Sequence, residues 1–184
     1  TGVKLANKLM PIVKANIFSC SANDSGWENI YSSKDSICRL IQMAKLSRDV
    51  WRSATEFILW DLYSYACLFG NKTKPLPVVL DEVQNLDHRL DSPLAKMLTE
   101  GRKYGLSLIL ATQTLSNLKK EEQDRLFQAA HKLFFAPAET EMDSYAKLLE
   151  QAVPGTNKKV WRDELAKLKK GECISVGLHM NTNG

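Results

Sequence analysis

The chain has 184 residues, of which 44% are hydrophobic and 25% are charged, and its formal net charge is +4. This balance is typical of one soluble domain with a buried core and excludes a disordered or fibrous protein, while the mild basicity permits a polyanionic partner without requiring one. The apolar stretches are broken before the roughly 18 residues that a membrane span needs, and no basic-then-apolar leader opens the chain, so we expect no membrane segment and a cytoplasmic location.

The N-terminal part of the chain mixes a short predicted helix with a polar loop. Apolar residues at helical spacing predict a helix over Val3–Lys14. Ser19–Ser36 is polar and contains a turn cluster, which predicts a loop, with a short turn around Trp27 as an option. The periodicity of Ile37–Met43 fits either a strand or the start of a helix, and the N-cap residue Ser47 that follows it favours the strand.

The strongest helix signal covers Arg48–Phe69. Apolar residues recur there at three- and four-residue steps, and Gly70-Asn71 supplies a stop. Trp51, Trp60 and Tyr63 form a second aromatic face. We therefore expect this helix to be buried on both sides.

Two strands with a helix between them are predicted next. Val78-Val79-Leu80 is a continuous apolar run, typical of a central parallel strand that is covered on both faces. Ser92 as N-cap and Pro93 at the first helical position open a helix that ends near Gly101. Leu106–Ala111 is a second apolar run and predicts another buried strand.

The C-terminal third continues the alternation. A polar loop leads into a helix that begins at Glu121-Glu122, where acidic side chains suit the positive end of the helix dipole. The remaining predicted elements are a strand at Lys132–Phe135, helices at Glu139–Glu150 and Asn157–Lys169, and a strand within Cys173–Leu178. Strands that alternate with helices predict an α/β fold with a mostly parallel sheet flanked by helices.

Polar side chains follow two neighbouring predicted strands. Asp81-Glu82 come directly after Leu80, and Thr112-Gln113 come directly after Ala111. In α/β folds, ligands bind beyond the carboxyl ends of the strands. An apolar run followed by Asp-Glu matches the Walker B pattern, although Pro77 is an imperfect first position; the first acid would hold Mg²⁺ and the second would orient or deprotonate the attacking water. An ordinary solvated strand end is the alternative.

Three other features can be interpreted either as functional or as ordinary structural features. Gln113 matches the sensor position that reaches toward the γ-phosphate, but a glutamine there can also bond its own loop. Arg102 could be an arginine finger or could complement a helix C-terminus. Lys119 and Lys120 could contact DNA phosphates, or could be a solvated pair balanced by Glu121-Glu122.

The segment from Val78 to Leu118 resembles the HerA and FtsK class of P-loop motor ATPases, which includes the VirB4 and VirD4 type of secretion and conjugation ATPases. Three parts carry the resemblance, namely Asp81-Glu82, the helix end Gly101-Arg102-Lys103-Tyr104-Gly105, and Ala111-Thr112-Gln113. The long predicted helix together with the sequence PLPVVLDEVQNL that follows it (Pro75–Leu86) is most similar to the HerA-type ATPases, called DptH, of DNA phosphorothioation-dependent restriction systems.

The resemblance implies a fold, ligands and partners. Residues 37–184 would form the C-terminal part of a RecA-like domain, on which residues 1–36 could pack. The parent protein would be a hexameric ring that hydrolyses ATP with Mg²⁺ and acts on DNA, with other subunits of a restriction complex as further partners. Asp81 would bind Mg²⁺ and, with Thr112, the nucleotide. Glu82, Gln113 and Arg102 would be catalytic, with Arg102 reaching into a neighbouring subunit.

One part of the family pattern is missing from the chain. A P-loop reads G-x-x-x-x-G-K-[ST] after a strand, and Gly70-Asn71-Lys72-Thr73 has the wrong order and follows a helix. Because the first residue is Thr1, we expect the P-loop upstream in a longer protein, and little or no ATP hydrolysis by this chain alone. The alternative is a catalytically inactive ATPase-derived module that serves as a binding or assembly platform in a restriction or secretion complex.

Other metal and nucleophile chemistry is not indicated. The three histidines lack the paired spacing of a zinc site, and the four cysteines lack C-x-x-C pairs, which favours free thiols. These residues are His88, His131, His179, Cys20, Cys38, Cys67 and Cys173.

Overall fold

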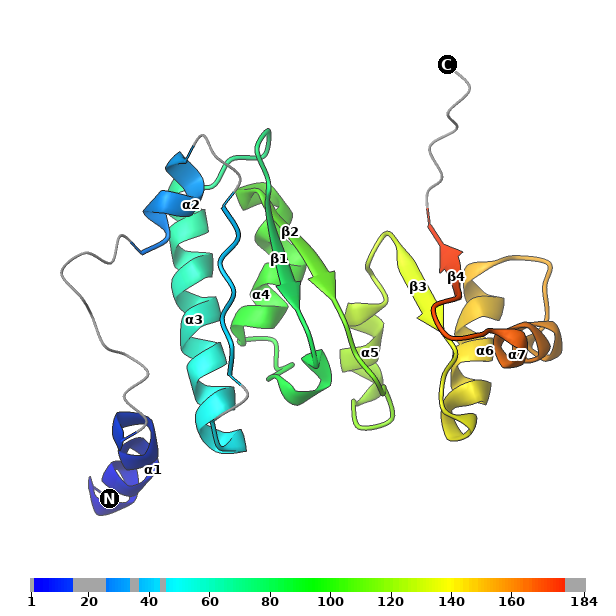
Figure 1. The fold of residues 1–184 in the computed structure, drawn as a ribbon, viewed down its shortest axis with the longest axis horizontal. Coiled ribbons are helices and arrows are strands. Elements are labelled where there is room, and N and C mark those ends of the chain that lie inside the picture. Colours follow the sequence, from blue (N-terminus) through cyan, green and yellow to red (C-terminus); the bar gives the residue numbers. More distant parts are fainter. Residues whose placement is uncertain (1, 15–25, 34–36, 44–45, 178–184) are drawn as a thin grey trace. The chain divides into compact units, whose positions relative to one another are not determined.

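The computed structural model of the chain describes residues 2–14, 26–33, 37–43 and 46–177. They form a mixed α/β fold (Figure 1), and two compact units divide the chain, Thr1–Ala111 and Thr112–Gly184. No helix within the described ranges is long and apolar enough to cross a membrane. The predicted turn before Gly26 and the residues from Leu178 onward lie outside the described residues.

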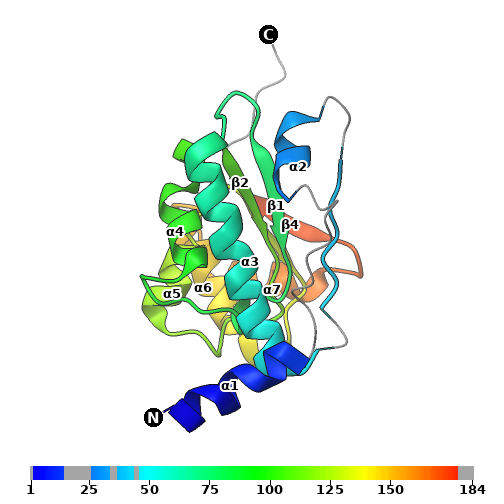
Figure 2. The ribbon, with the colours of Figure 1, turned by 90° about the vertical axis from the view of Figure 1, so that its left-hand side faces the viewer.

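Four α-helices belong to the first unit: α1 (Gly2–Lys14), α2 (Glu28–Ser32), α3 (Arg48–Phe69) and α4 (Pro93–Glu100). The bounds of α3 confirm the helix predicted from its periodicity. The side chain of Ser92 caps α4, since its Oγ accepts a hydrogen bond from Ala95 N at 3.2 Å. α3 packs against both α1 and α4, and Figure 2 shows α1 crossing the N-terminal end of α3.

The sheet of the first unit has two parallel strands, β1 (Leu76–Leu80) and β2 (Leu106–Leu110), in register from Leu76 opposite Leu106 to Leu80 opposite Leu110. Alternate residues are exposed, with Val79 at 67% and Ile109 at 55%. The prediction that both faces are covered is therefore wrong for this unit. Helix α4 contacts β2 from one side, and continuous apolar composition does not reveal whether a second layer exists.

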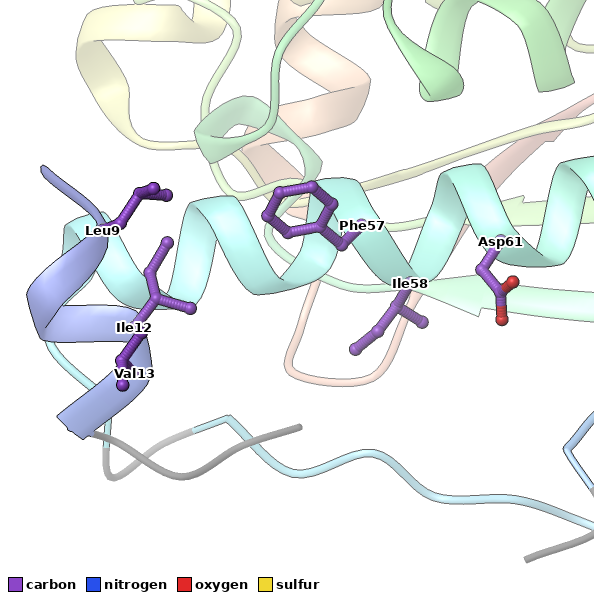
Figure 3. A pocket seen from close by; sticks show the side chains of 6 residues that line it. All are labelled: Leu9, Ile12, Val13, Phe57, Ile58 and Asp61. Atoms are coloured by element: carbon purple, nitrogen blue, oxygen red, sulfur yellow. The ribbon is translucent and has the colours of Figure 1, made fainter. Parts of the chain in front are cut away.

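Two other predictions for the first unit are also wrong. Residues 37–43 form no strand, because periodicity alone cannot supply the partner strand with which a ladder forms, and Leu40 is 87% exposed. α3 is not buried on both sides either, since Phe57 is 53% and Trp60 38% exposed. Phe57 instead lines an open apolar cavity of about 580 Å³ between α1 and α3 (Figure 3).

The second unit contains helices α5 (Lys120–Leu126), α6 (Met142–Ala152) and α7 (Lys158–Lys167) and strands β3 (Lys132–Phe135) and β4 (Cys173–Val176). All five were predicted in sequence, with small differences at their ends. β3 and β4 pair antiparallel, with Lys132 opposite Val176, so a mostly parallel sheet is wrong here. The core of this unit consists of Phe134, Met142, Ala146, Leu149 and Leu165.

Candidate functional site

Asp81 and Glu82 lie at the carboxyl end of β1, as predicted, in a tight turn. Glu82 has φ 55° and ψ 38°, and it is the only non-glycine residue in the described part of the chain with a positive φ. Asp81 Oδ1 accepts a hydrogen bond from Glu82 N at 2.8 Å. A left-handed conformation costs a non-glycine residue about 1–2 kcal/mol, and such strain clusters at functional sites.

The backbone on either side of this turn is held by the neighbouring strand. Ala111 N donates to Leu80 O at 2.9 Å, and Val83 N donates to Ala111 O at 3.1 Å. A short 3-10 helix, η1 (Val83–Asn85), follows directly. The half-buried carboxylate of Glu82 accepts hydrogen bonds from the side-chain amides of Gln84 and Asn85. The second acid of the pair is therefore oriented by its own turn.

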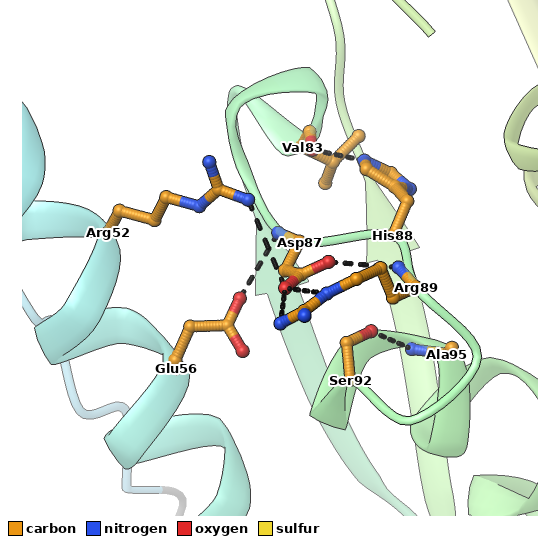
Figure 4. Close-up of polar contacts among 8 residues, drawn as sticks. All are labelled: Arg52, Glu56, Val83, Asp87, His88, Arg89, Ser92 and Ala95. Atoms are coloured by element: carbon orange, nitrogen blue, oxygen red, sulfur yellow. Dashed lines mark hydrogen bonds and ion pairs between the residues drawn. The ribbon is translucent and has the colours of Figure 1, made fainter. Parts of the chain in front are cut away.

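A buried carboxylate that the sequence reasoning missed fixes the loop after this turn (Figure 4). Asp87 is 8% exposed and accepts hydrogen bonds from Arg89 N at 2.9 Å and Arg89 Nε at 2.7 Å. Arg52, on α3, lies 4.0 Å from the same carboxylate. Glu56, also on α3, accepts a hydrogen bond from Asp87 N at 3.1 Å. These contacts tie the loop that carries the acidic pair to the long helix.

The carboxyl groups of this network have opposite pKa shifts. The hydrogen bond from the Arg89 side chain holds the pKa of Asp87 below its ordinary value, although burial opposes this. Burial raises the pKa of Glu56, and the charge of Asp87 adds to the rise, while the hydrogen bond from Asp87 N and the charges of Arg52 and Arg89 oppose it. The folded state therefore favours the ionised form of Asp87, whereas it makes protonation of Glu56 easier than in an unfolded chain.

The neighbouring histidine is structural. His88 is 5% exposed, and its Nε2 lies 2.8 Å from the carbonyl oxygen of Val83, so Nε2 carries the proton and donates. Within the described ranges, no three histidine, cysteine or acidic residues group together as a metal site would require. The bond from His88 adds a further tie between the loop and η1.

Arg102 lies far from the acidic pair within the first unit. It belongs to the 3-10 helix η2 (Gly101–Tyr104), which leads into the amino end of β2, whereas Asp81 follows the carboxyl end of the parallel strand β1. Five strand residues span about 16 Å. The side chain of Arg102 is exposed and has no ion pair with a described residue, in contrast to Lys103, which pairs with Glu100. Arg102 therefore cannot reach the acids of its own unit.

The segment Gly70-Asn71-Lys72-Thr73 has a structural role at that same end of the strands. A Cβ on Gly70 would lie 1.9 Å from Tyr104 O, and a Cβ on Gly105 would lie 2.3 Å from Asn71 O. Leu76 N also donates to Gly105 O at 2.7 Å. The two glycines allow the loop before β1 to contact the loop before β2 backbone to backbone.

Thr112 and Gln113 belong to the second unit, so their pairing with Asp81 and Glu82 stays a prediction. Thr112 Oγ1 donates to Thr114 O at 2.8 Å, and the side chain of Gln113 is exposed. Lys119 and Lys120 are exposed as well, and Lys119 N donates to Glu122 Oε2 at 2.8 Å.

A second buried carboxylate that the sequence reasoning missed binds the loop after Gln113. Glu141 is 7% exposed, and its Oε1 accepts from the Thr114 hydroxyl, from Leu115 N at 3.1 Å and from Ser116 N at 3.0 Å. Burial raises the pKa of Glu141, but these hydrogen bonds outweigh burial and hold the pKa below its ordinary value. The only sequence signal was an acidic run, Glu139-Thr140-Glu141, before a helix.

Comparison with known proteins supports the general part of the resemblance. Residues 75–149 match the family model described as the TraM recognition site of TraD and TraG, a domain found in TraG/TraD/FtsK-like conjugation coupling proteins. The match does not single out the restriction ATPases. None of the curated proteins matches the chain. The segment that contains Asp81, Glu82, Arg102, Gln113 and Glu141 is thus similar to the TraM-recognition domain of TraG- and TraD-type coupling proteins.

Proposed function

We propose that the chain is the Walker B portion of an oligomeric, DNA-acting motor ATPase with a RecA-like core, active in the cytoplasm. The observation that carries the proposal is the acidic pair at the carboxyl end of β1, with Glu82 in a left-handed conformation. Backbone strain of this kind clusters at functional sites, and a site that must aim a carboxylate would account for it.

The residues present fit Mg²⁺ bound with a nucleotide. Mg²⁺ is usually held by one or two carboxylates together with substrate phosphates and water, so it does not need a cluster of protein ligands. Asp81 is exposed and would be the carboxylate ligand, with Thr112 near the nucleotide. The ion would neutralise charge on the phosphates. Glu82 would orient or deprotonate the attacking water, and Gln113 would contact the γ-phosphate.

The proposal is tested by changing each acid in the full-length protein. In Glu82→Gln, ATP turnover should fall about 10²- to 10⁴-fold, the usual loss for a general base, while nucleotide stays bound. In Asp81→Ala, Mg²⁺-dependent nucleotide binding should also weaken. Asp91→Asn, an exposed acid on the following loop, is the matched control and should match the wild type. Near-normal turnover in Glu82→Gln would contradict the catalytic assignment.

Arg102 would act on the site of a neighbouring subunit, because it lies at the opposite end of the strands from the acids of its own unit. Arg102→Ala and Glu82→Gln proteins should each be inactive alone. Mixed rings should regain part of the activity, since a Glu82→Gln subunit can still supply Arg102 to an Arg102→Ala neighbour. Mixtures that stay inactive, although native mass spectrometry shows mixed rings, would rule out a finger in trans.

The biological setting is a finer part of the proposal. The sequence of α3 and β1 favours phosphorothioation-dependent restriction, whereas the matched family model favours conjugation. DNA carrying phosphorothioate linkages should stimulate ATP turnover more than unmodified DNA if restriction is the setting. Equal stimulation by both DNAs would favour conjugation-type transfer. Lys119→Glu should reduce stimulation by either DNA, because backbone contacts are independent of sequence.

A second candidate function is a partner-binding platform without ATP turnover. The description of the matched family model as a recognition site favours it. In this case the full-length protein would bind a protein partner through residues 75–149 equally well with Asp81→Ala and Glu82→Gln. Calorimetric titration with Mg²⁺-ATP separates the two functions, because a platform should bind no nucleotide.

A further inference from the structure

The loop that carries Gln113 is held from inside the second unit by one carboxylate oxygen. Glu141 Oε1 accepts all three bonds, from the hydroxyl of Thr114 and from the backbone N–H groups of Leu115 and Ser116. Glu141 lies at the end of the 3-10 helix η3 (Glu139–Glu141), which leads into α6. The first bonded residue, Thr114, immediately follows Gln113 in the chain.

Other contacts fix the two ends of the same loop. Gln123 Nε2, on α5, donates to Leu115 O at 2.9 Å and to Leu118 O at 3.0 Å. The hydroxyl of Thr112 donates to Thr114 O at 2.8 Å. Leu115 and Leu118 are buried, so the loop is anchored by packing as well as by hydrogen bonds. The backbone next to Gln113, an exposed residue, is therefore fixed.

Packing alone does not require a carboxylate at position 141. A buried ionised group costs free energy unless it is hydrogen-bonded, and an irregular loop with two inward N–H groups needs an acceptor. Hydrogen bonds to a charged acceptor are stronger than those to a neutral one. An anionic acceptor thus makes this loop rigid at the point where a side chain must be aimed.

We propose that Glu141 is a positioning residue of the ATPase site, which fixes the direction of Gln113 by binding the backbone just after it. This inference rests on the proposed function, since it assigns Glu141 a role through Gln113. Glu141 touches neither nucleotide nor water in this role, so it should affect turnover and leave nucleotide affinity unchanged.

Three variants of the full-length protein test the role. Glu141→Leu removes the acceptor and should raise amide hydrogen exchange at Leu115 and Ser116 and lower kcat, each about tenfold or more, with KM for ATP unchanged. Glu141→Gln keeps an acceptor oxygen and should retain most of the turnover. Glu139→Gln is the matched control two residues away, where the side chain is exposed in an ion pair with Arg162, and it should behave as wild type.

A double mutant separates this inference from the proposed function. If Glu141 acts through Gln113, the variant with both Glu141→Leu and Gln113→Ala should be no slower than Gln113→Ala alone, because coupled residues are not additive. Fully additive losses, or unchanged exchange at Leu115 and Ser116 in Glu141→Leu, would overturn the positioning role and leave the ATPase site intact. Unchanged turnover in Gln113→Ala would instead remove the sensor assignment from the proposed function.

Discussion

Arg89 holds Asp87 with both its backbone and its side chain, through Arg89 N at 2.9 Å from Oδ1 and Arg89 Nε at 2.7 Å from Oδ2. The arginine side chain is 74% exposed, whereas that of Asp87 is 10% exposed. Asp87→Ala should therefore lower the free energy of unfolding of the first unit by about 2 kcal/mol, the usual cost of removing one partner from buried hydrogen bonds. Urea denaturation would measure it.

Asp91→Ala is the control for this change. Asp91 lies on the same loop and is exposed, so its removal should alter the free energy of unfolding by less than about 0.5 kcal/mol. Equal effects of the two substitutions would contradict a special role for the buried carboxylate.

The neighbouring Glu56 predicts an unusual pH dependence. Burial raises its pKa in the folded state, so the folded protein favours the protonated form more than the unfolded chain does. The contribution of Glu56 to stability is then fully present below the unfolded pKa of about 4.3 and is lost as the pH rises through the folded value. Glu56→Gln keeps the acceptor for Asp87 N and removes this loss.

Urea denaturation of wild type and Glu56→Gln over a pH series tests this prediction. The stability of the variant relative to wild type should increase as the pH is raised from about 4 to 7. Asp87 acts in the opposite sense: because its pKa is lowered, it stabilises the protein at pH values above the ordinary pKa of an aspartate, and this stabilisation is lost on acidification. Asp87 is present in both proteins, so its effect cancels in the comparison. A constant difference between the two proteins at every pH would refute the shift.

The elements that were predicted correctly are those specified by local interactions. The helical spacing of Arg48–Phe69 and its glycine stop reproduced α3, and the Ser92 side chain caps α4 as its position indicated. The parallel pairing of β1 with β2 agrees with the prediction, but other features that depend on distant partners were missed. Ile37–Met43 had the composition of a strand but pairs with no strand of the described residues. β3 pairs antiparallel with β4, whose first residue, Cys173, lies 38 residues after Phe135 at the end of β3.

The same distinction applies to the candidate site. The position of Asp81 and Glu82 at a strand end followed from the apolar run before them. The left-handed conformation of Glu82 has no signal in sequence, because glutamate is not a residue that favours it. The role of Asp87 depends on Arg52 and Glu56 of α3, and only the fold brings that helix to the loop.

The glycine contact at the amino end of β1 and β2 gives a further stability prediction. Gly105 has φ +74°, and a Cβ there would lie 2.3 Å from Asn71 O, which is backbone and cannot rotate away. Gly105→Ala should therefore cost about 3 kcal/mol, combining strain in the left-handed region with overpacking. Thermal and urea unfolding would measure the loss.

Gly26→Ala provides the comparison that isolates the clash. Gly26 has φ +54°, and no atom of a described residue lies within 4 Å of a Cβ placed there, so only the conformational cost of about 1–2 kcal/mol should remain. A loss at Gly105 no larger than that at Gly26 would show that the loops can separate without cost, and would contradict the close backbone contact.

The strain at Glu82 can be measured without any assay of turnover. Glu82→Gly and Glu82→Ala both remove the carboxylate and its bonds to Gln84 and Asn85, so their difference reports the backbone alone. In an ordinary segment alanine is the more stable by about 0.5–1 kcal/mol, but at φ 55° glycine should be the more stable by about 1 kcal/mol. Urea unfolding shows which of the two variants has the larger free energy of unfolding.

Greater stability of the alanine variant would mean that Glu82 is not held in a left-handed conformation, and would remove the observation on which the catalytic assignment rests. An advantage for glycine would mean that the backbone at position 82 is held in the left-handed region, which is the strain from which the catalytic assignment is argued.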